Sequence, residues 1–150
     1  MHFRAALPSD AADISALILS FQAQLTLHPD GRGADQFFAS VSEESERGYI
    51  ESGRYEYLLA VEDNDLAGFV AIRDKTHLFH LFVASHFQRT GLARELWNRV
   101  RNPAVRYTVN SSLNAVLAYE HLGFVTAGTL QQVHGIVFQP MQLEPEENDA

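Results

Sequence analysis

The chain contains no cysteine. This absence excludes disulfide bonds, thiolate metal sites and catalysis by a thiol. The chain also lacks any apolar run close to the roughly 20 residues that a membrane-spanning helix needs. Its first residues, MHFRAALPSDAADI, have no apolar stretch of the kind that a secretory signal carries. We therefore expect a cytoplasmic protein with no membrane partner.

Positive charge is also scarce, with 11 Lys and Arg residues against 19 Asp and Glu residues and a net charge of −8. This balance argues against a nucleic-acid partner, because phosphate backbones favour a basic surface. The segment EPEENDA, 144–150, holds four of the acidic residues, and we expect it to be a disordered tail. The remainder, 1–143, has the length of one domain with a sizeable core.

Several common site motifs are missing. Neither G-x-G-x-x-G nor G-x-x-x-x-G-K-S/T occurs, so any nucleotide is bound by another arrangement. Ser111 and Ser112 lack the G-x-S-x-G surroundings of a nucleophilic serine, and we expect them to cap the helix that follows. The histidines are scattered and combine with no Asp or Glu at ligand spacing, so we expect no metal site.

Apolar periodicity and turn residues predict the elements of the chain. In order, they are a strand at 3–7, a helix from Pro8-Ser9-Asp10 to Leu25, a helix over much of 35–50, a hairpin of strands at 55–62 and 66–73, a strand at 77–83, a helix at 92–101, a strand at 105–109, a helix at 113–121, and strands at 124–133 and 136–143. This order, β α α β β β α β α β β, predicts an α/β protein with one mixed sheet and helices on both faces. In the second helix, we interpret the run Glu43-Glu44-Ser45-Glu46 as a solvated face.

The clearest functional signal lies at 78–100, LFHLFVASHFQRTGLARELWNRV. An apolar strand ends in a polar loop that contains Gly91, and an amphipathic helix follows at once. Backbone N–H groups are unpaired at such a helix start, and the helix dipole adds partial positive charge there. Arg89 and Arg94 flank the loop. We therefore expect this loop to bind a phosphate or a pyrophosphate.

Two motifs, separated by one predicted strand, carry a family resemblance. QRTGLA fits the pattern Q/R-x-x-G-x-G/A at Gln88, Gly91 and Ala93. The pattern A-x-x-x-Y-E-x-x-G-F fits at Ala115, Tyr119, Glu120, Gly123 and Phe124. These motifs, in this order, resemble the GNAT superfamily of acyl-CoA-dependent N-acetyltransferases, and the element order from 3 to 143 is similar to that fold.

The resemblance implies a mostly antiparallel sheet that is splayed at its central strands. In this fold the strand at 77–83 carries a bulge and diverges from the strand at 105–109, and the pantetheine of acetyl-CoA lies in the resulting V. Strand amides there would polarise the thioester carbonyl. The residues implied in pantetheine binding are Leu81, Phe82 and Val83. The residues implied in pyrophosphate binding are Gln88, Arg89, Thr90, Gly91, Leu92, Ala93 and Arg94.

One position departs from the family pattern. Family members often have an asparagine seven residues before the tyrosine, where it contacts pantetheine, and this chain has Ser112. Asn110 and Asn114 lie nearby. We expect Ser112 and Asn114 in the binding site, and which asparagine compensates, if either does, stays open.

The resemblance assigns Tyr119 as the acid that protonates the departing thiolate. A tyrosine suits this role because its pKa of about 10 is near that expected for the CoA thiol. The alternative is that Tyr119 only packs an apolar helix face beside Leu122.

His77 is the predicted base, because its offset from Gly91 matches a position where some family members carry a catalytic glutamate. An imidazole titrating near pH 6.5 takes up an amine's proton directly or through water. His80 is a second candidate, although it has opposite strand parity to His77 unless a bulge separates them. The alternative for both is a hydrogen-bonded structural role.

We therefore expect an N-acetyltransferase that moves an acetyl group from acetyl-CoA to a primary amine of a small molecule, peptide or protein by direct attack on the thioester. The alternatives are a non-catalytic acyl-CoA-binding or regulatory module on the same fold and a generic nucleotide-binding domain. The acceptor site is expected between 28–38 and 130–137. Neither segment holds a carboxylate cluster, so polyamines, aminoglycosides, amino acids, peptide N-termini and lysine stay open. Dimers are common in the family, which leaves a homodimer open as well.

Overall fold

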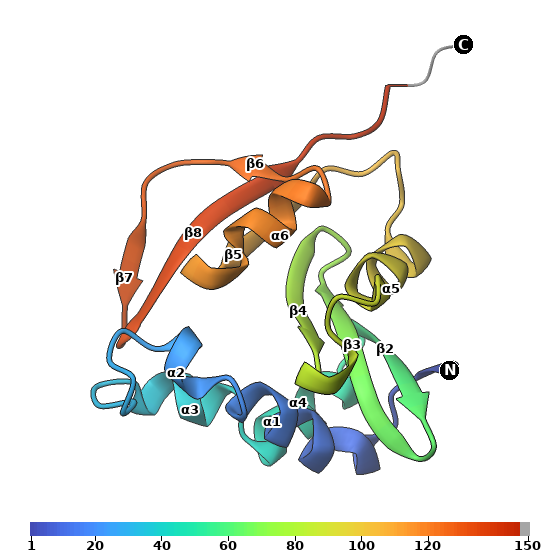
Figure 1. The fold of residues 1–150 in the computed structure, drawn as a ribbon, viewed down its shortest axis with the longest axis horizontal. Helices are drawn as coiled ribbons and strands as arrows, with labels where there is room; N and C mark the ends of the chain where they lie inside the picture. Colours follow the sequence, from blue (N-terminus) through green and yellow to red (C-terminus); the bar gives the residue numbers. More distant parts are fainter. Residues whose placement is uncertain (148–150) are drawn as a thin grey trace.

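The computed structural model describes residues 1–147 as one mixed sheet with helices on both faces (Figure 1). The strands are β1 (His2–Ala5), β2 (Tyr55–Glu62), β3 (Asp65–Arg73), β4 (His77–Val83), β5 (Tyr107–Ser111), β6 (Val125–Thr126), β7 (Gln131–Val133) and β8 (Ile136–Leu143). The helices are α1 (Ala11–Leu19), α2 (Gln22–Leu25), α3 (Asp35–Ser40), α4 (Glu43–Glu51), α5 (Leu92–Val100) and α6 (Val116–His121), with 3₁₀ turns η1 (Pro8–Asp10), η2 (Ser85–Phe87) and η3 (Leu113–Ala115).

The sheet is mostly antiparallel and splayed at its centre, as predicted. Its strand order is β1-β2-β3-β4-β5-β8-β6, with β7 pairing to β8. Within the described residues, β4 and β5 are the one parallel pair, and they meet only where His77 lies opposite Thr108 and Leu78 opposite Val109. Beyond that point the two strands diverge, and Figure 1 shows β4 and β8 separating toward opposite sides.

A bulge in β4 accompanies this divergence. The register between β3 and β4 shifts at Ala71 and Ile72, and Phe79 is the extra residue on β4. Because of this extra residue, the side chains of β4 do not alternate between the two faces of the sheet from one end of the strand to the other. His77 and His80 therefore project from the same face of the sheet, the face covered by α1 and α4.

Each face of the sheet carries its own apolar core. On one side, Ile14 and Ile18 of α1 are fully buried with Phe69 of β3. On the other side, Leu96 and Trp97 of α5 are fully buried in a second cluster. The helical spacing of these residues in the sequence predicted both buried faces, because positions three and four apart lie on one side of a helix.

Several predicted elements are divided by local geometry. The helix predicted to reach Leu25 is interrupted after α1, and the one predicted over 35–50 is interrupted at Val41. Ser42 then caps α4, where its hydroxyl accepts a hydrogen bond from the Ser45 amide. The strand predicted at 124–133 is split into β6 and β7, and Gly128 adopts a positive φ between them.

The prediction of a solvated face for the run Glu43-Glu44-Ser45-Glu46 is wrong for its last residue. The side chain of Glu46 has an exposed fraction of 0%. Four consecutive helical residues turn through about 300°, so they cannot all face solvent when the helix packs on a sheet. Glu46 is the member of the run that points toward the sheet.

None of the helices within residues 1–147 is long and apolar enough to span a membrane. Of the predicted tail, residues 148–150 lie outside the described residues. In the described portion, Glu144 accepts a hydrogen bond from Arg106 at 3.0 Å, and the Glu146 amide donates to the Pro103 carbonyl at 2.8 Å.

Candidate active site

A cleft of about 940 Å³ lies along β4, where this strand diverges from β5. It is bounded by the helices on the α1–α4 face, the loop before α5, the η3–α6 segment and the start of β8. The predicted site residues that line it are His77, Leu81, Phe82, Val83, Gln88, Arg89, Gly91, Leu92, Ala93, Arg94, Ser112, Asn114 and Tyr119. Thr90 is the predicted residue that does not line it, and its hydroxyl donates to the Phe87 carbonyl instead.

The loop before α5 is built to present its backbone. Gly91 occupies the N-cap position with φ +84°, and no side chain caps the helix. A Cβ at Gly91 would meet no atom within 4 Å, so the positive φ, rather than a lack of space, favours glycine there. Gln88 ties the loop to β4 by donating to the Val83 carbonyl at 3.1 Å. The amides at the start of α5 are therefore held facing the cleft, with the positive end of the helix dipole behind them.

Strand β4 offers backbone groups to the same cleft. Its pairing with β5 ends at Leu78, so the β5-facing amides and carbonyls from Phe79 to Val83 have no strand partner in the described chain. Unpaired backbone groups of this kind bind an extended ligand as an added strand does.

Tyr119 reaches the cleft from α6 and is almost fully buried, with 8% of its surface exposed. Its ring packs edge-on against Phe124 at 5.6 Å between centroids. Its hydroxyl makes no hydrogen bond within residues 1–147 and is not fully enclosed by protein. Burial raises the pKa of this phenol above its usual value of 10.0, so it remains protonated at neutral pH and is able to donate.

The position that departs from the family pattern also lies on the cleft. Ser112 lines it together with both candidate asparagines, Asn110 and Asn114. Ser112 occupies the N-cap position of η3 as predicted, but its hydroxyl makes no capping hydrogen bond. The hydroxyl of Ser111 donates to the Ser112 carbonyl.

The two histidines of β4 have different surroundings. Nδ1 of His77 lies 2.7 Å from the Thr108 hydroxyl oxygen. Burial, followed by the positive charge of Arg73 and by His80, lowers the pKa of His77 to about 4. His77 is therefore uncharged at neutral pH.

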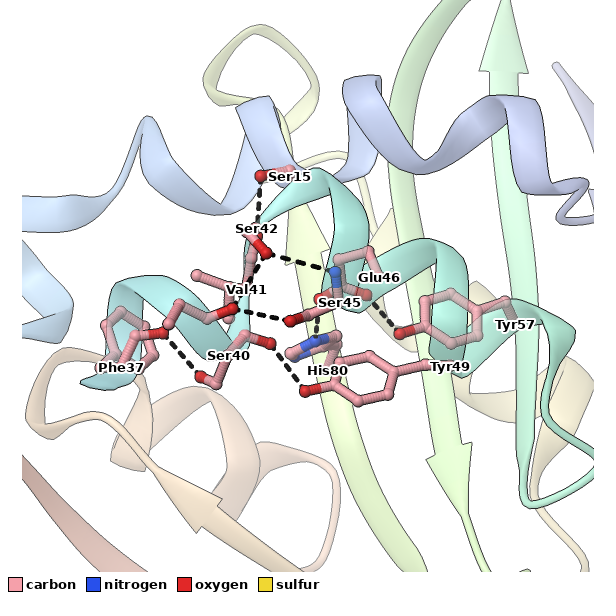
Figure 2. Close-up of polar contacts among 11 residues, drawn as sticks. Ser15, Phe37, Ser40, Val41, Ser42, Ser45, Glu46, Tyr49, Tyr57 and His80 are labelled. Atoms are coloured by element: carbon pink, nitrogen blue, oxygen red, sulfur yellow. Dashed lines mark hydrogen bonds and ion pairs between the residues drawn. The ribbon is translucent and has the colours of Figure 1, made fainter. Parts of the chain in front are cut away.

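His80 belongs to a buried network that no sequence motif indicates (Figure 2). Its Nε2 lies 2.7 Å from Oε1 of Glu46, and the Tyr57 hydroxyl donates to the other oxygen, Oε2. The bond to a carboxylate fixes the proton of the imidazole on Nε2. Nδ1 of His80 has no hydrogen-bond partner within residues 1–147 and is not fully enclosed by protein. Because His80 lines the cleft, this nitrogen is its accessible acceptor.

Aromatic rings surround His80 on the cleft side. Tyr49, Tyr55 and Phe79 pack mutually, with centroid distances of 4.7, 5.1 and 5.2 Å, and Phe79 lies 4.0 Å from the His80 ring. The guanidinium of Arg73 lies over Phe79, 5.6 Å from its centroid. We call the part of the cleft lined by Tyr49, Tyr55, Arg73, Phe79 and His80 the aromatic chamber.

The two segments expected to shape the acceptor site touch each other, because the backbone of Gly135 lies against that of Gly33 and Ala34. Just before the first segment, the Leu27 amide donates to the Gly135 carbonyl at 2.7 Å, and Thr26 pairs with Ile136. Figure 1 shows the β7–β8 turn beside α2 and the loop that follows it. From these segments, Phe37, Ile136 and Val137 line the cleft.

No group of three or more His, Asp or Glu side chains in the described part of the chain is arranged to hold a metal ion. The histidines of β4 instead face a carboxylate, a hydroxyl and aromatic rings.

The sequence profile of the GNAT acetyltransferase domain matches residues 25–145. No curated protein sequence matches the chain significantly.

Solved structures share the fold at low sequence identity. A GCN5-related N-acetyltransferase from Rhodopseudomonas palustris superposes with a TM-score of 0.75 at 18% identity, covering 95% of this chain and 94% of that one. A PaiA N-acetyltransferase from Thermoplasma acidophilum, in complex with coenzyme A, gives 0.73 at 13% identity and covers 95% and 98%. An aminoglycoside 6′-N-acetyltransferase complexed with coenzyme A gives 0.68 at 14% identity and covers 100% of both chains.

The surroundings of His77 predict an unusual titration. NMR titration of its ring should give a midpoint near 4, because burial and Arg73 oppose its positive charge. The unfolded chain takes up this proton near pH 6.5 and the folded protein only near pH 4, so the free energy of unfolding should fall as the pH is lowered through that window. Arg73→Gln should raise the midpoint, whereas Lys75→Gln, which removes an exposed charge outside the cleft, should leave it in place. A midpoint near 6.5 in the unaltered protein would contradict this description.

Proposed function

The chain belongs to the GNAT acetyltransferase family, and from that premise we propose that it transfers an acetyl group from acetyl-CoA to a primary amine. The observation that carries the proposal is the single cleft in which the Gly91 loop, the free edge of β4 and the Tyr119 hydroxyl meet. This arrangement supports a domain, 1–143, that binds one anionic, extended thioester and acts at its sulfur end. Residence in the cytoplasm and a homodimer stay predictions from the sequence.

We expect the pyrophosphate of acetyl-CoA to bind at the start of α5. Arg89, Gly91, Leu92, Ala93 and Arg94 line the cleft there, and the backbone amides at this helix start have no side-chain cap. The pantetheine would extend along β4, bonding to the backbone of Leu81–Val83 on the side that β5 leaves free. Ser112 and Asn114 line the opposite wall and offer polar contacts to the same chain of atoms.

The reaction forms one bond and breaks another. The uncharged amine nitrogen attacks the thioester carbonyl carbon, the new C–N bond forms, and the C–S bond breaks. The nitrogen loses one proton to a base, and the departing thiolate gains one from an acid. The products are the acetylated amine and coenzyme A, and the base returns its proton to the acid through solvent.

Tyr119 is the proposed acid. Its hydroxyl has no competing partner within the described residues, and burial keeps its pKa above the ordinary value, so the phenol enters the reaction protonated. A purely structural tyrosine would not need a hydroxyl that is open to the cleft and free of protein partners within the described residues.

Two residues are candidates for the base. His77, the base predicted from the sequence, is uncharged at neutral pH, but a group with a pKa of about 4 is a weak proton acceptor. His80 has a carboxylate partner on Nε2 and a free Nδ1 on the cleft. Glu46 would stabilise the positive charge that forms when His80 takes a proton, as in other carboxylate–histidine pairs. We therefore favour His80 as the base, with Glu46 as its positioning residue.

A non-catalytic acyl-CoA-binding module on the same fold is the alternative function. It would need the Gly91 loop and β4, but it would not need a protonated phenol and an oriented imidazole in the cleft. A generic nucleotide-binding domain would need neither the phenol nor the imidazole. In that case ATP or NAD would compete with coenzyme A for the cleft.

Calorimetry with coenzyme A tests the binding step. The unaltered protein should form a complex, and Gly91→Ala should weaken it about tenfold or more, because alanine is strained at φ +84° and displaces the loop amides. Gly48→Ala is the matched control, since this exposed glycine of α4 has open space around its Cα. An absence of binding at millimolar coenzyme A would contradict the proposed function.

Tyr119→Phe tests the acid. We expect kcat to fall about 10²-fold or more while the affinity for acetyl-CoA stays nearly unchanged, because only the proton donor is lost. Tyr107→Phe is the control: Tyr107 is also buried, but it lies outside the cleft, where its hydroxyl accepts a hydrogen bond from the Asn102 amide. An unchanged kcat in Tyr119→Phe would remove the assignment, and binding without turnover over a broad amine panel would favour the non-catalytic module.

Glu46→Gln tests the positioning residue, because it keeps the shape of the side chain and removes its charge. We expect kcat to fall at least about tenfold and the acidic limb of the pH–rate profile to move, with His80→Asn losing about 10²–10⁴-fold. Glu44→Gln, on the exposed side of the same helix, should change neither quantity. Thermal unfolding checks that each variant is folded. If His77→Asn abolishes the acidic limb and His80→Asn retains it, His77 is the base.

A further inference from the structure

The walls of the cleft carry positive charge and no negative charge. Arg73, Arg89 and Arg94 line it, whereas no aspartate or glutamate among residues 1–147 does. Glu46 lies behind the wall, but its exposed fraction is 0% and both of its oxygens are hydrogen-bonded. An acceptor therefore finds no carboxylate with which to pair a second ammonium group.

The aromatic chamber offers two kinds of contact. Tyr49, Tyr55 and Phe79 form a packed wall of rings, all partly exposed. Such a surface favours an apolar and especially an aromatic body, because rings pack edge-on or offset against other rings. The second contact is the guanidinium of Arg73, which lies over the Phe79 ring.

Arg73 is only weakly paired within the protein. Its ion pair in the described chain is with Asp74, with 4.0 Å between Nε and Oδ2. Asp74 is already engaged, because Arg54 donates to its two oxygens at 3.0 and 2.8 Å. The donors of the Arg73 guanidinium are therefore available to a ligand, and their planar fork matches a carboxylate.

The charge of Arg73 also favours the reactive form of an amine. It acts on the His77 ring, where it contributes to the lowered pKa of about 4. The same positive field disfavours an ammonium ion in the chamber and so promotes loss of its proton. A free amine is the form that attacks a thioester.

Resting on the proposed acetyl transfer, we propose that the acceptor is a small amine that carries both an aromatic group and a carboxylate. The rings of Tyr49, Tyr55 and Phe79 hold the aromatic body, and Arg73 pairs with the carboxylate. Polycationic acceptors, such as polyamines and aminoglycosides, should be poorer substrates, because no acidic side chain of residues 1–147 lines the cleft to pair with their further ammonium groups.

Matched acceptor pairs test this proposal. L-Phenylalanine and phenethylamine differ by the carboxylate, as do L-tryptophan and tryptamine, and release of coenzyme A measures kcat/KM for each. We expect the carboxylate-bearing member of each pair to be preferred about tenfold or more, because a charge-assisted pair is lost in the other. Spermidine and tobramycin should react more slowly than either amino acid.

Arg73→Gln identifies the residue responsible. It should lower kcat/KM for the two amino acids about tenfold or more beyond any change that it causes for the two decarboxylated amines, so that the preference disappears. Lys75→Gln removes one exposed positive charge outside the cleft, and it should retain the preference.

The outcomes separate this inference from the function on which it rests. Turnover of spermidine, tobramycin or the decarboxylated amines in preference to the amino acids overturns the acceptor class and leaves acetyl transfer intact. A preference that survives in Arg73→Gln overturns the role of Arg73. Coenzyme A binding without turnover of any of these amines contradicts the acceptor class and, if a broader panel also fails, the proposed function.

Discussion

Strand β4 pairs with β3 along its length but meets β5 at only two residues, His77 and Leu78. The bulge at Phe79 increases the local twist and turns β4 away from its neighbour. Backbone groups left without a partner are costly unless water or a ligand satisfies them. The divergence therefore creates the cleft and also supplies the polar edge that an extended ligand completes. The same bulge brings His77 and His80 to one face, so the geometry of the proposed chemistry depends on it.

The second constraint is a buried charge. A carboxylate is expensive to remove from water unless its oxygens are hydrogen-bonded, and Glu46 satisfies this condition through Tyr57 and His80. These two bonds connect α4 to β2 and β4, so they fix the position of this helix, which covers the acceptor side, against the sheet (Figure 2). Two hydrogen bonds from side chains to the backbone connect the neighbouring helices as well. The Ser15 hydroxyl donates to the Val41 carbonyl, and the Tyr49 hydroxyl donates to the Ser40 carbonyl. The same network therefore orients His80 and holds Tyr49, which lines the aromatic chamber, in place.

Local patterns predicted much of this arrangement. The hairpin of β2 and β3, the bounds of β4 and the glycine loop before α5 follow from alternation and turn chemistry, which short windows of sequence record. Glu46 could not be identified in this way, because its burial depends on which side of α4 meets the sheet. The pairing of His80 with Glu46 joins residues 34 positions apart. The break at Val41 was not predicted, because the apolar spacing of Phe37, Phe38 and Val41 is helical up to the break and residues 43–51 are again helical after it.

The sign of the charge in the cleft is opposite to that of the whole chain. The net charge is −8, which by itself disfavours an anionic substrate. Exposed charges are screened over about 8 Å at physiological ionic strength, so distant acidic residues contribute little at the cleft. What an incoming substrate meets is the local set: Arg89 and Arg94 beside the helix start, and Arg73 in the aromatic chamber. Arg89 and Arg94 lie beside the proposed pyrophosphate site of the cleft. Arg73 lies in the aromatic chamber, which also contains the proposed base, His80. The net charge of the whole chain therefore says less about which substrate binds than the positions of these three arginines in the cleft do.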